Sequence, residues 1–198
     1  MPQFDLRGIK VAKYVNTAGT ISYTSAQALG DAMTANLEMR FAEGRLYAES
    51  TLAEYMRKAT GGTISVGVKY IKTAAQQLLF GSKAKTRSIT YQEGTTQIST
   101  SVSGLVQSAK DVPAYVGIAF YAPDMIDGTE KYTCVFARKA LFGPPSMTLQ
   151  TAGESIQFNT PTTSGEFLAD DSSSQDMLEV AVCDSEAAAI AWVTAVLA

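Results

Sequence analysis

The sequence has 198 residues, of which 46% are hydrophobic and 18% are charged, with a net charge of −3. This composition is typical of one folded domain with a sizeable core, and it excludes an intrinsically disordered chain. The acidic balance disfavours tight binding to a nucleic-acid backbone, and the absence of histidine excludes Ser–His and Cys–His catalytic arrangements.

The N-terminal part predicts strands joined by turns of small residues. Residues 8–15 alternate, with Ile9 and Val11 on one face, and a turn at 16–19 leads to a second strand at 20–24. A longer strand follows at 31–41. Its core face is expected to carry five apolar side chains, namely Met33, Ala35, Leu37, Met39 and Phe41.

The next segment predicts a return of the chain and a first helix. Glu43-Gly44 offers a turn, 45–50 is the expected partner strand, and 52–58 has the spacing of a short helix. Gly61-Gly62 then interrupts the chain before a strand at 63–71. The buried face of that strand is expected to hold Ile64, Val66, Val68 and Tyr70. A helix is predicted at 73–80, capped by Thr73 and ended by Gly81.

Residues 82–110 differ in kind, because they are rich in Ser, Thr and Gln. They carry a basic group made of Lys83, Lys85 and Arg87. The segment is either an exposed strand pair or a long mobile loop. The basic group is too small for nucleic-acid recognition, so a solvated face or a charge partner for a neighbouring subunit is the better interpretation.

The remaining chain predicts further strands and a final helix. An apolar strand at 113–121 pairs with 131–140 across a polar loop at 123–130, and strands at 146–150 and 154–159 precede a turn at 160–165. A solvated acidic linker at 170–175 leads to a strand at 177–183. The helix at 185–197 is capped by Ser185, and its apolar stripes require a docking surface.

No sequence motif predicts a catalytic residue, a metal ligand or a cofactor site. P-loop, GxGxxG and GxSxG motifs are absent. Asp170, Asp171 and Asp176 lack the spacing of a calcium-binding loop, and a polar hairpin tip explains the acids at 124–130 as well as a cation site does. The two cysteines are interpreted as small buried hydrophobic residues and not as a disulfide or a metal pair.

Two further absences bear on location. No stretch approaches the roughly 20 apolar residues needed to cross a bilayer, so no membrane partner is expected. The N-terminal residues do not have the pattern of a secretion signal, so folding is expected to begin in a cytoplasm.

The order of the segments resembles the siphophage major tail tube protein family over about residues 4–161. The stretches that carry this resemblance are GIKVAKY, TISY, LEMRFAEGRLYAES, TISVGVKYI followed by AAQQLLFGS, YVGIAFYAP, YTCVFARKALFGPPSMTLQ and ESIQFNTPT. The resemblance implies a mainly β fold, a β-sandwich or barrel-like pair of antiparallel sheets with a flanking helix and a C-terminal helix. It divides the chain into a tube domain at 1–170, with an insert at 82–110, and a C-terminal extension at 171–198.

The resemblance also implies a structural virion protein without enzymatic activity or cofactor. Family members form hexameric rings that stack into a phage tail tube, made in the host bacterial cytoplasm. Their partners are further copies, the tape-measure protein and tail-tip or terminator proteins, and DNA passes through the lumen without sequence-specific binding. The tube subunit of a contractile tail, injection or secretion system is the alternative. A small-ligand-binding β-sandwich or an unfamiliar enzyme is a remote one.

On this reading, alternating strands can place one polar face toward a lumen, and the polar insert is the natural contact between rings. The candidate lumen-facing residues are Thr34, Asn36, Glu38, Ser65 and Lys69, for which an ordinary outer surface is an equally good interpretation. The candidate inter-ring residues are Lys83, Lys85 and Arg87.

Overall fold

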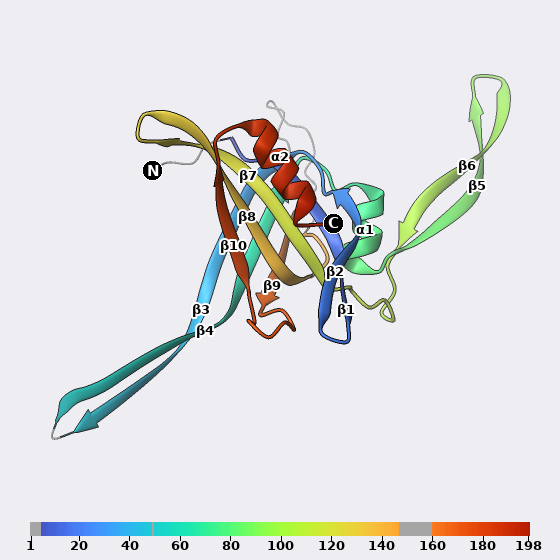
Figure 1. The fold of residues 1–198 in the computed structure, drawn as a ribbon. Helices are drawn as coiled ribbons and strands as arrows, with labels where there is room; N and C mark the ends of the chain where they lie inside the picture. Colours follow the sequence, from blue (N-terminus) through green and yellow to red (C-terminus); the bar gives the residue numbers. More distant parts are fainter. Residues whose placement is uncertain (1–4, 49, 147–159) are drawn as a thin grey trace, which may run out of the picture.

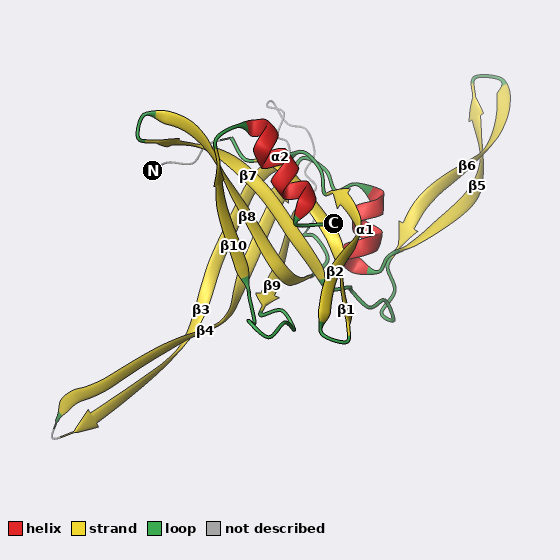
Figure 2. Ribbon diagram, in the orientation of Figure 1, coloured by secondary structure: helices red, strands yellow, loops and turns green. Residues whose placement is uncertain are grey.

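A computed structural model, which describes residues 5–48, 50–146 and 160–198, shows a body of packed strands from which two hairpins project (Figure 1). The described strands are β1 (Arg7–Thr17), β2 (Thr20–Ala28), β3 (Ala32–Ala48), β4 (Thr51–Val68), β5 (Lys83–Glu93), β6 (Thr96–Val106), β7 (Val116–Ile126), β8 (Thr129–Phe142), β9 (Thr162–Leu168) and β10 (Leu178–Cys183). The helices are α1 (Thr73–Phe80) and α2 (Glu186–Ala195). The prediction of a mainly β chain with antiparallel sheets and two helices is confirmed (Figure 2).

The body is one antiparallel sheet in the order β2-β1-β7-β8-β9-β4-β3. The edge of β8 that faces away from β7 is shared, because its residues 132–137 pair with β10 and its residues 139–142 pair with β9. The sheet folds back on itself, since the buried side chains of β4 join those of β1 and β7 in one cluster. The C-terminal strand β10 is therefore part of the main sheet.

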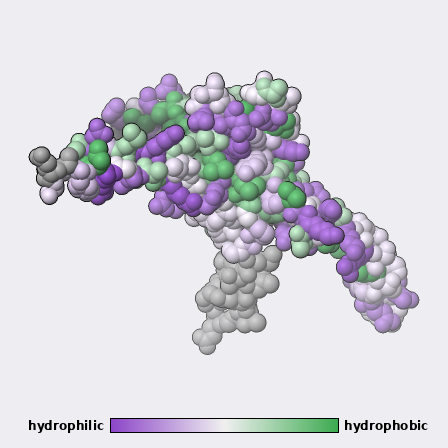
Figure 3. Space-filling view, turned by 90° about the horizontal axis from the view of Figure 1, so that it is seen from below, coloured by the Kyte–Doolittle hydropathy of each residue, from purple (hydrophilic) through white to green (hydrophobic). Residues whose placement is uncertain are grey.

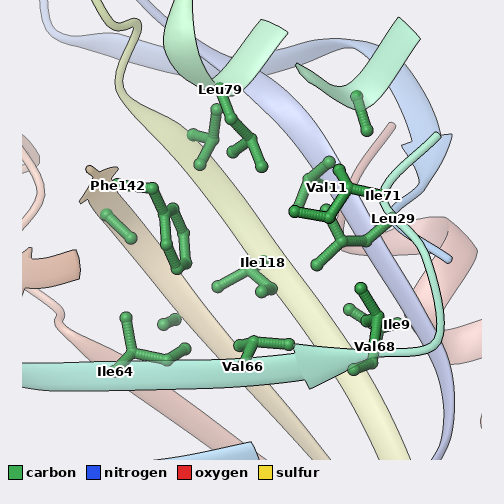
Figure 4. Close-up of a cluster of buried hydrophobic side chains, with 14 of the residues drawn as sticks. Ile9, Val11, Leu29, Ile64, Val66, Val68, Ile71, Leu79, Ile118 and Phe142 are labelled. Atoms are coloured by element: carbon green, nitrogen blue, oxygen red, sulfur yellow. The ribbon is translucent and has the colours of Figure 1, made fainter. Parts of the chain in front are cut away.

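The first core cluster lies inside this fold and is closed by α1 (Figure 4). Ile64, Val66 and Val68 of β4 are fully buried and meet Ile118 from β7. Alternation with a period of two produces this face, as predicted for the strand at 63–71. Tyr70 lies beyond the end of β4 and is exposed, so its predicted place in the core is wrong.

The first helix closes one side of this cluster. The buried face of α1 is made of Ala75, Leu79 and Phe80. Gly81 ends the helix in the left-handed conformation, with φ of 68°, as predicted. The predicted cap at Thr73 is wrong, because the capping position is Lys72 and no side-chain cap bond forms there.

The second core cluster lies between the opposite face of the sheet and α2. Val193 and Leu197 are buried against Phe136 and Tyr23. Ser185 caps the helix as predicted, its Oγ accepting a hydrogen bond from the backbone N–H of Ala188 at 3.3 Å. The C-terminal helix thus docks on its own sheet, which is the surface that its apolar stripes require.

Several local predictions are wrong in the β3–β4 region. Strand β3 continues through the expected turn at Glu43-Gly44, so residues 45–48 belong to β3 and not to its partner strand, and residues 52–58 belong to β4 and not to a helix. Gly61 and Gly62 lie within β4 and do not interrupt it, since both pair with β3 and Gly62 also pairs with β9. Of the five apolar residues expected in the core, only Ala35 and Leu37 pack against it, and Met33, Met39 and Phe41 are exposed.

The later strands follow the predictions more closely. The β7–β8 hairpin is confirmed, with a turn of only two residues, Asp127 and Gly128, at φ of 51° and 75°. Residues 162–165 belong to β9, so the predicted turn at 160–165 is wrong there. The predicted strands at 146–150 and 154–159 lie outside the described residues except for residue 146, which forms an isolated bridge with Thr162.

Candidate functional site

Two long hairpins extend from opposite sides of the body, and they are the most unusual feature of the surface (Figures 1 and 3). One is the outer part of β3–β4, residues 41–59. The other is β5–β6, which occupies the segment predicted to be either a strand pair or a loop. With 11 residues in each strand, the second hairpin is about 36 Å long. An isolated two-stranded ribbon is only marginally stable in water.

The β5–β6 ribbon has two chemically different faces. Lys83 pairs with Val106, and Arg87 pairs with Val102, so basic and apolar side chains share one face. The other face is a ladder of hydroxyl groups, with hydrogen bonds between Thr86 and Ser103 at 3.2 Å and between Thr90 and Ser99 at 3.0 Å. The predicted basic group Lys83, Lys85 and Arg87 is thereby brought together on one strand face.

The outer β3–β4 hairpin carries large apolar and aromatic side chains into solvent. The guanidinium of Arg57 lies 3.7 Å from the centre of the Phe41 ring, and Glu43 forms ion pairs at 3.5 Å with both Arg45 and Arg57. On the other face Met56 is 73% exposed. Large apolar side chains that are exposed together on a projecting element are typical of an interaction surface.

Four of the five candidate lumen-facing residues lie together on the outer face of the β3–β4–β9 layer. Thr34 pairs with Gly67, and Asn36 pairs with Ser65, so their side chains share the face opposite the core. Glu38 has the same parity. Ser164 of β9 extends this hydroxyl-rich face, its Oγ donating a hydrogen bond to Ser65 Oγ at 3.2 Å.

The fifth candidate lies at the margin of this face. Lys69 follows the last residue of β4, where its backbone N–H donates a hydrogen bond to the carbonyl oxygen of Asp31 at 2.9 Å. Its side chain is exposed. A charge pair between Arg40 and Glu166, at 2.8 Å, lies at the opposite margin of the same face.

The segment predicted as a solvated acidic linker is instead tied to the sheet. The Asp170 side chain is fully buried, and its Oδ2 lies 3.0 Å from Nε of Arg138 in an ion pair. Oδ1 of Asp170 accepts hydrogen bonds from the backbone N–H groups of Ser172 and Asp176, both at 3.1 Å. No local pattern in the sequence predicts this ion pair, because Arg138 lies in β8 and no short spacing relates it to Asp170.

A second missed cluster surrounds Asp171. Lys139 Nζ lies 2.7 and 2.8 Å from the two carboxylate oxygens, and the Tyr14 hydroxyl donates a hydrogen bond at 2.9 Å. These bonds, with one from Asn16, lower the pKa of the Asp171 carboxyl. The ammonium of Lys139 also lies 5.2 Å from the centre of the Tyr14 ring. The cluster joins β1, β8 and the segment after β9.

The described residues form no group of three or more metal-ligating side chains, and none of their helices is long and apolar enough to cross a membrane. A cavity of about 320 Å³ opens between the start of β3 and the ends of β7 and β8. Its lining combines apolar residues, including Phe120 and Val135, with the polar residues Asp5, Thr34 and Thr133.

The chain matches no known protein-family model and no curated protein.

Proposed function

We propose that this protein is a structural subunit that assembles with copies of itself into the tail tube of a long-tailed bacteriophage, and that it is not an enzyme. The observation that carries the proposal is the pair of hairpins on opposite sides of one body, both exposing apolar side chains. A monomer gains no stability from such projections. Contacts with further copies would bury these side chains and order both ribbons.

The polar outer face of β3–β4–β9 supports the same proposal. It carries small hydroxyl side chains, among them Thr34 and Ser65, with one ion pair between Glu166 and Arg40 and the exposed carboxylate of Glu38. A surface of this kind, turned toward a lumen, attracts the DNA backbone little and lets it slide. We also propose that the protein is located in the virion and that DNA and the tape-measure protein pass through the tube.

The β5–β6 ribbon is the proposed contact between successive rings. The test replaces residues 84–105 by a short Gly-Ser turn and compares the variant with the intact chain by sedimentation velocity. The intact chain is expected to form large assemblies. The variant should keep the thermal unfolding of the monomer but fail to assemble or form only short species. Assemblies of normal size and stability in the variant would refute this role of the ribbon.

A further inference from the structure

Many charged side chains of the described chain form ion pairs, and two clustered groups of opposite sign are among those that do not. In the described part of the chain, Lys83, Lys85 and Arg87 on β5 have no acidic partner. The acids at the β7–β8 turn have no basic partner there either. Asp127 and Glu130 are exposed, and Glu130 accepts a hydrogen bond only from the hydroxyl of Tyr132, at 3.0 Å.

The acidic turn also contains a buried carboxylate that is only half satisfied. Asp124 is 7% exposed, and its Oδ2 accepts a hydrogen bond from Thr133 Oγ1 at 3.4 Å. Its Oδ1 has no hydrogen-bond partner among the described residues. Burial of a carboxylate without full compensation is costly. Because Oδ1 is buried, a donor from outside the chain could reach it only if the turn rearranges, and that donor would then remove the cost.

The two groups cannot meet within one molecule. The β7–β8 turn and the β5–β6 ribbon extend from opposite sides of the body (Figure 1). Complementary patches on opposite sides of one subunit produce a head-to-tail contact, in which the ribbon of each copy meets the turn of the next. Such heterologous contacts close into rings or continue as helical filaments.

We propose that the basic face of the β5–β6 ribbon docks on the acidic β7–β8 turn of a second copy of this chain. The proposal rests on the self-assembly proposed above and names its contact. Apolar side chains accompany the charges on both sides: Val102, 49% exposed, is paired with Arg87, and Met125 is exposed at the turn. An apolar centre with a charged rim is the usual anatomy of a specific interface.

The test uses two full-length variants with reversed charges. Lys85→Glu with Arg87→Glu makes the ribbon acidic, and Asp127→Lys with Glu130→Lys makes the turn basic. Each variant alone should need at least about ten times the wild-type concentration to assemble, because like charges then face each other. An equimolar mixture should regain assembly, since the acidic ribbon of one variant meets the basic turn of the other.

Lys13→Glu with Lys72→Glu is the matched control. Both lysines are exposed and have no acidic partner in the described chain, and the change of net charge is the same as in the ribbon variant. This control should assemble as the wild type does. Thermal unfolding of each variant establishes that the monomer is folded.

The outcomes separate the two proposals. If the wild type does not assemble, the self-assembly proposal fails. If the wild type assembles but the ribbon variant assembles equally well, the charged contact is refuted. If both variants lose assembly and the mixture does not regain it, the β7–β8 turn is not the acceptor, and the inference is overturned.

Discussion

Gly62 is the position where one added methyl group should most disturb the body of the protein. A Cβ atom there would lie 2.3 Å from the carbonyl oxygen of Glu38 and 2.3 Å from the Phe167 ring. Both contacts are far shorter than real Cβ atoms make, and β4 is held between β3 on one side and β9 on the other. Strand β4 therefore cannot move away from one neighbour without opening its pairing with the other.

Gly62→Ala should therefore destabilise the monomer by about 3 kcal/mol, the upper end of the cost of overpacking a core. For a chain of this size the corresponding fall in melting temperature is about 6–12 °C. The assay is thermal unfolding followed by circular dichroism, at a concentration below that of assembly.

Gly44→Ala in β3 is the control, because a Cβ atom there meets nothing within 4 Å. Its stability should stay within about 1 kcal/mol of the wild type, or rise, since alanine restricts the unfolded chain. Equal stability of Gly62→Ala and the wild type, or an equal loss in both variants, would refute the packing of Phe167 on Gly62.

Three further predictions concern charge and thiol chemistry. Arg138→Ala leaves the buried Asp170 carboxylate without its ion-pair partner and should cost about 2–3 kcal/mol in chemical denaturation, because Arg138 itself is partly exposed. The lowered pKa of Asp171 contributes stability that is present above about pH 4 and lost as the pH falls through the folded-state pKa, so Asp171→Asn should flatten the loss of stability below about pH 4. Burial raises the pKa of Cys134 to about 12, so iodoacetamide at pH 8 should label Cys183 first, as mass spectrometry of the native protein can show.

Each of these has a matched comparison. Lys131→Ala removes an ion pair to Asp184, whose side chain is 88% exposed, and should cost less than about 1 kcal/mol. An equal loss of stability in Arg138→Ala and Lys131→Ala would contradict the stabilising role of the buried Asp170–Arg138 ion pair. A wild-type acid profile in Asp171→Asn, or faster labelling of Cys134 than of Cys183, would contradict the other two predictions.

Turns and helix ends could be predicted from the sequence, because they depend on only a few neighbouring residues. Asp127-Gly128 has the residues that a two-residue hairpin turn requires, Gly81 ends α1, and Ser185 caps α2. The alternation of Ile64, Val66 and Val68 identified a buried strand face, because a half-buried strand and its side-chain pattern share one period.

The projecting hairpins could not be predicted in this way. Leu52, Tyr55 and Met56 have helical spacing, but these residues lie on an exposed strand, so no core selects their pattern. Met39 and Phe41 alternate correctly yet lie where β3 leaves the body, beyond the reach of the core. Patterning predicts burial within the core of one chain, and these segments project beyond that core.

Some polar sites could likewise be predicted from local patterns, and others could not. Thr34, Asn36, Glu38 and Ser65 share one face, as their parity in two paired strands predicted. The pairing of Asp170 with Arg138 depends on β8 approaching the segment after β9, which no local signal encodes. The acidic, serine-rich composition of residues 170–175 therefore wrongly predicts a solvated linker.

The measurement that tests the central claim most directly is negative-stain electron microscopy of the purified protein across a concentration series. The account predicts rings or hollow tubes of uniform width that become more numerous and longer as the concentration rises. A monodisperse monomer at every concentration, with both hairpins intact, would contradict self-assembly as the function of this chain.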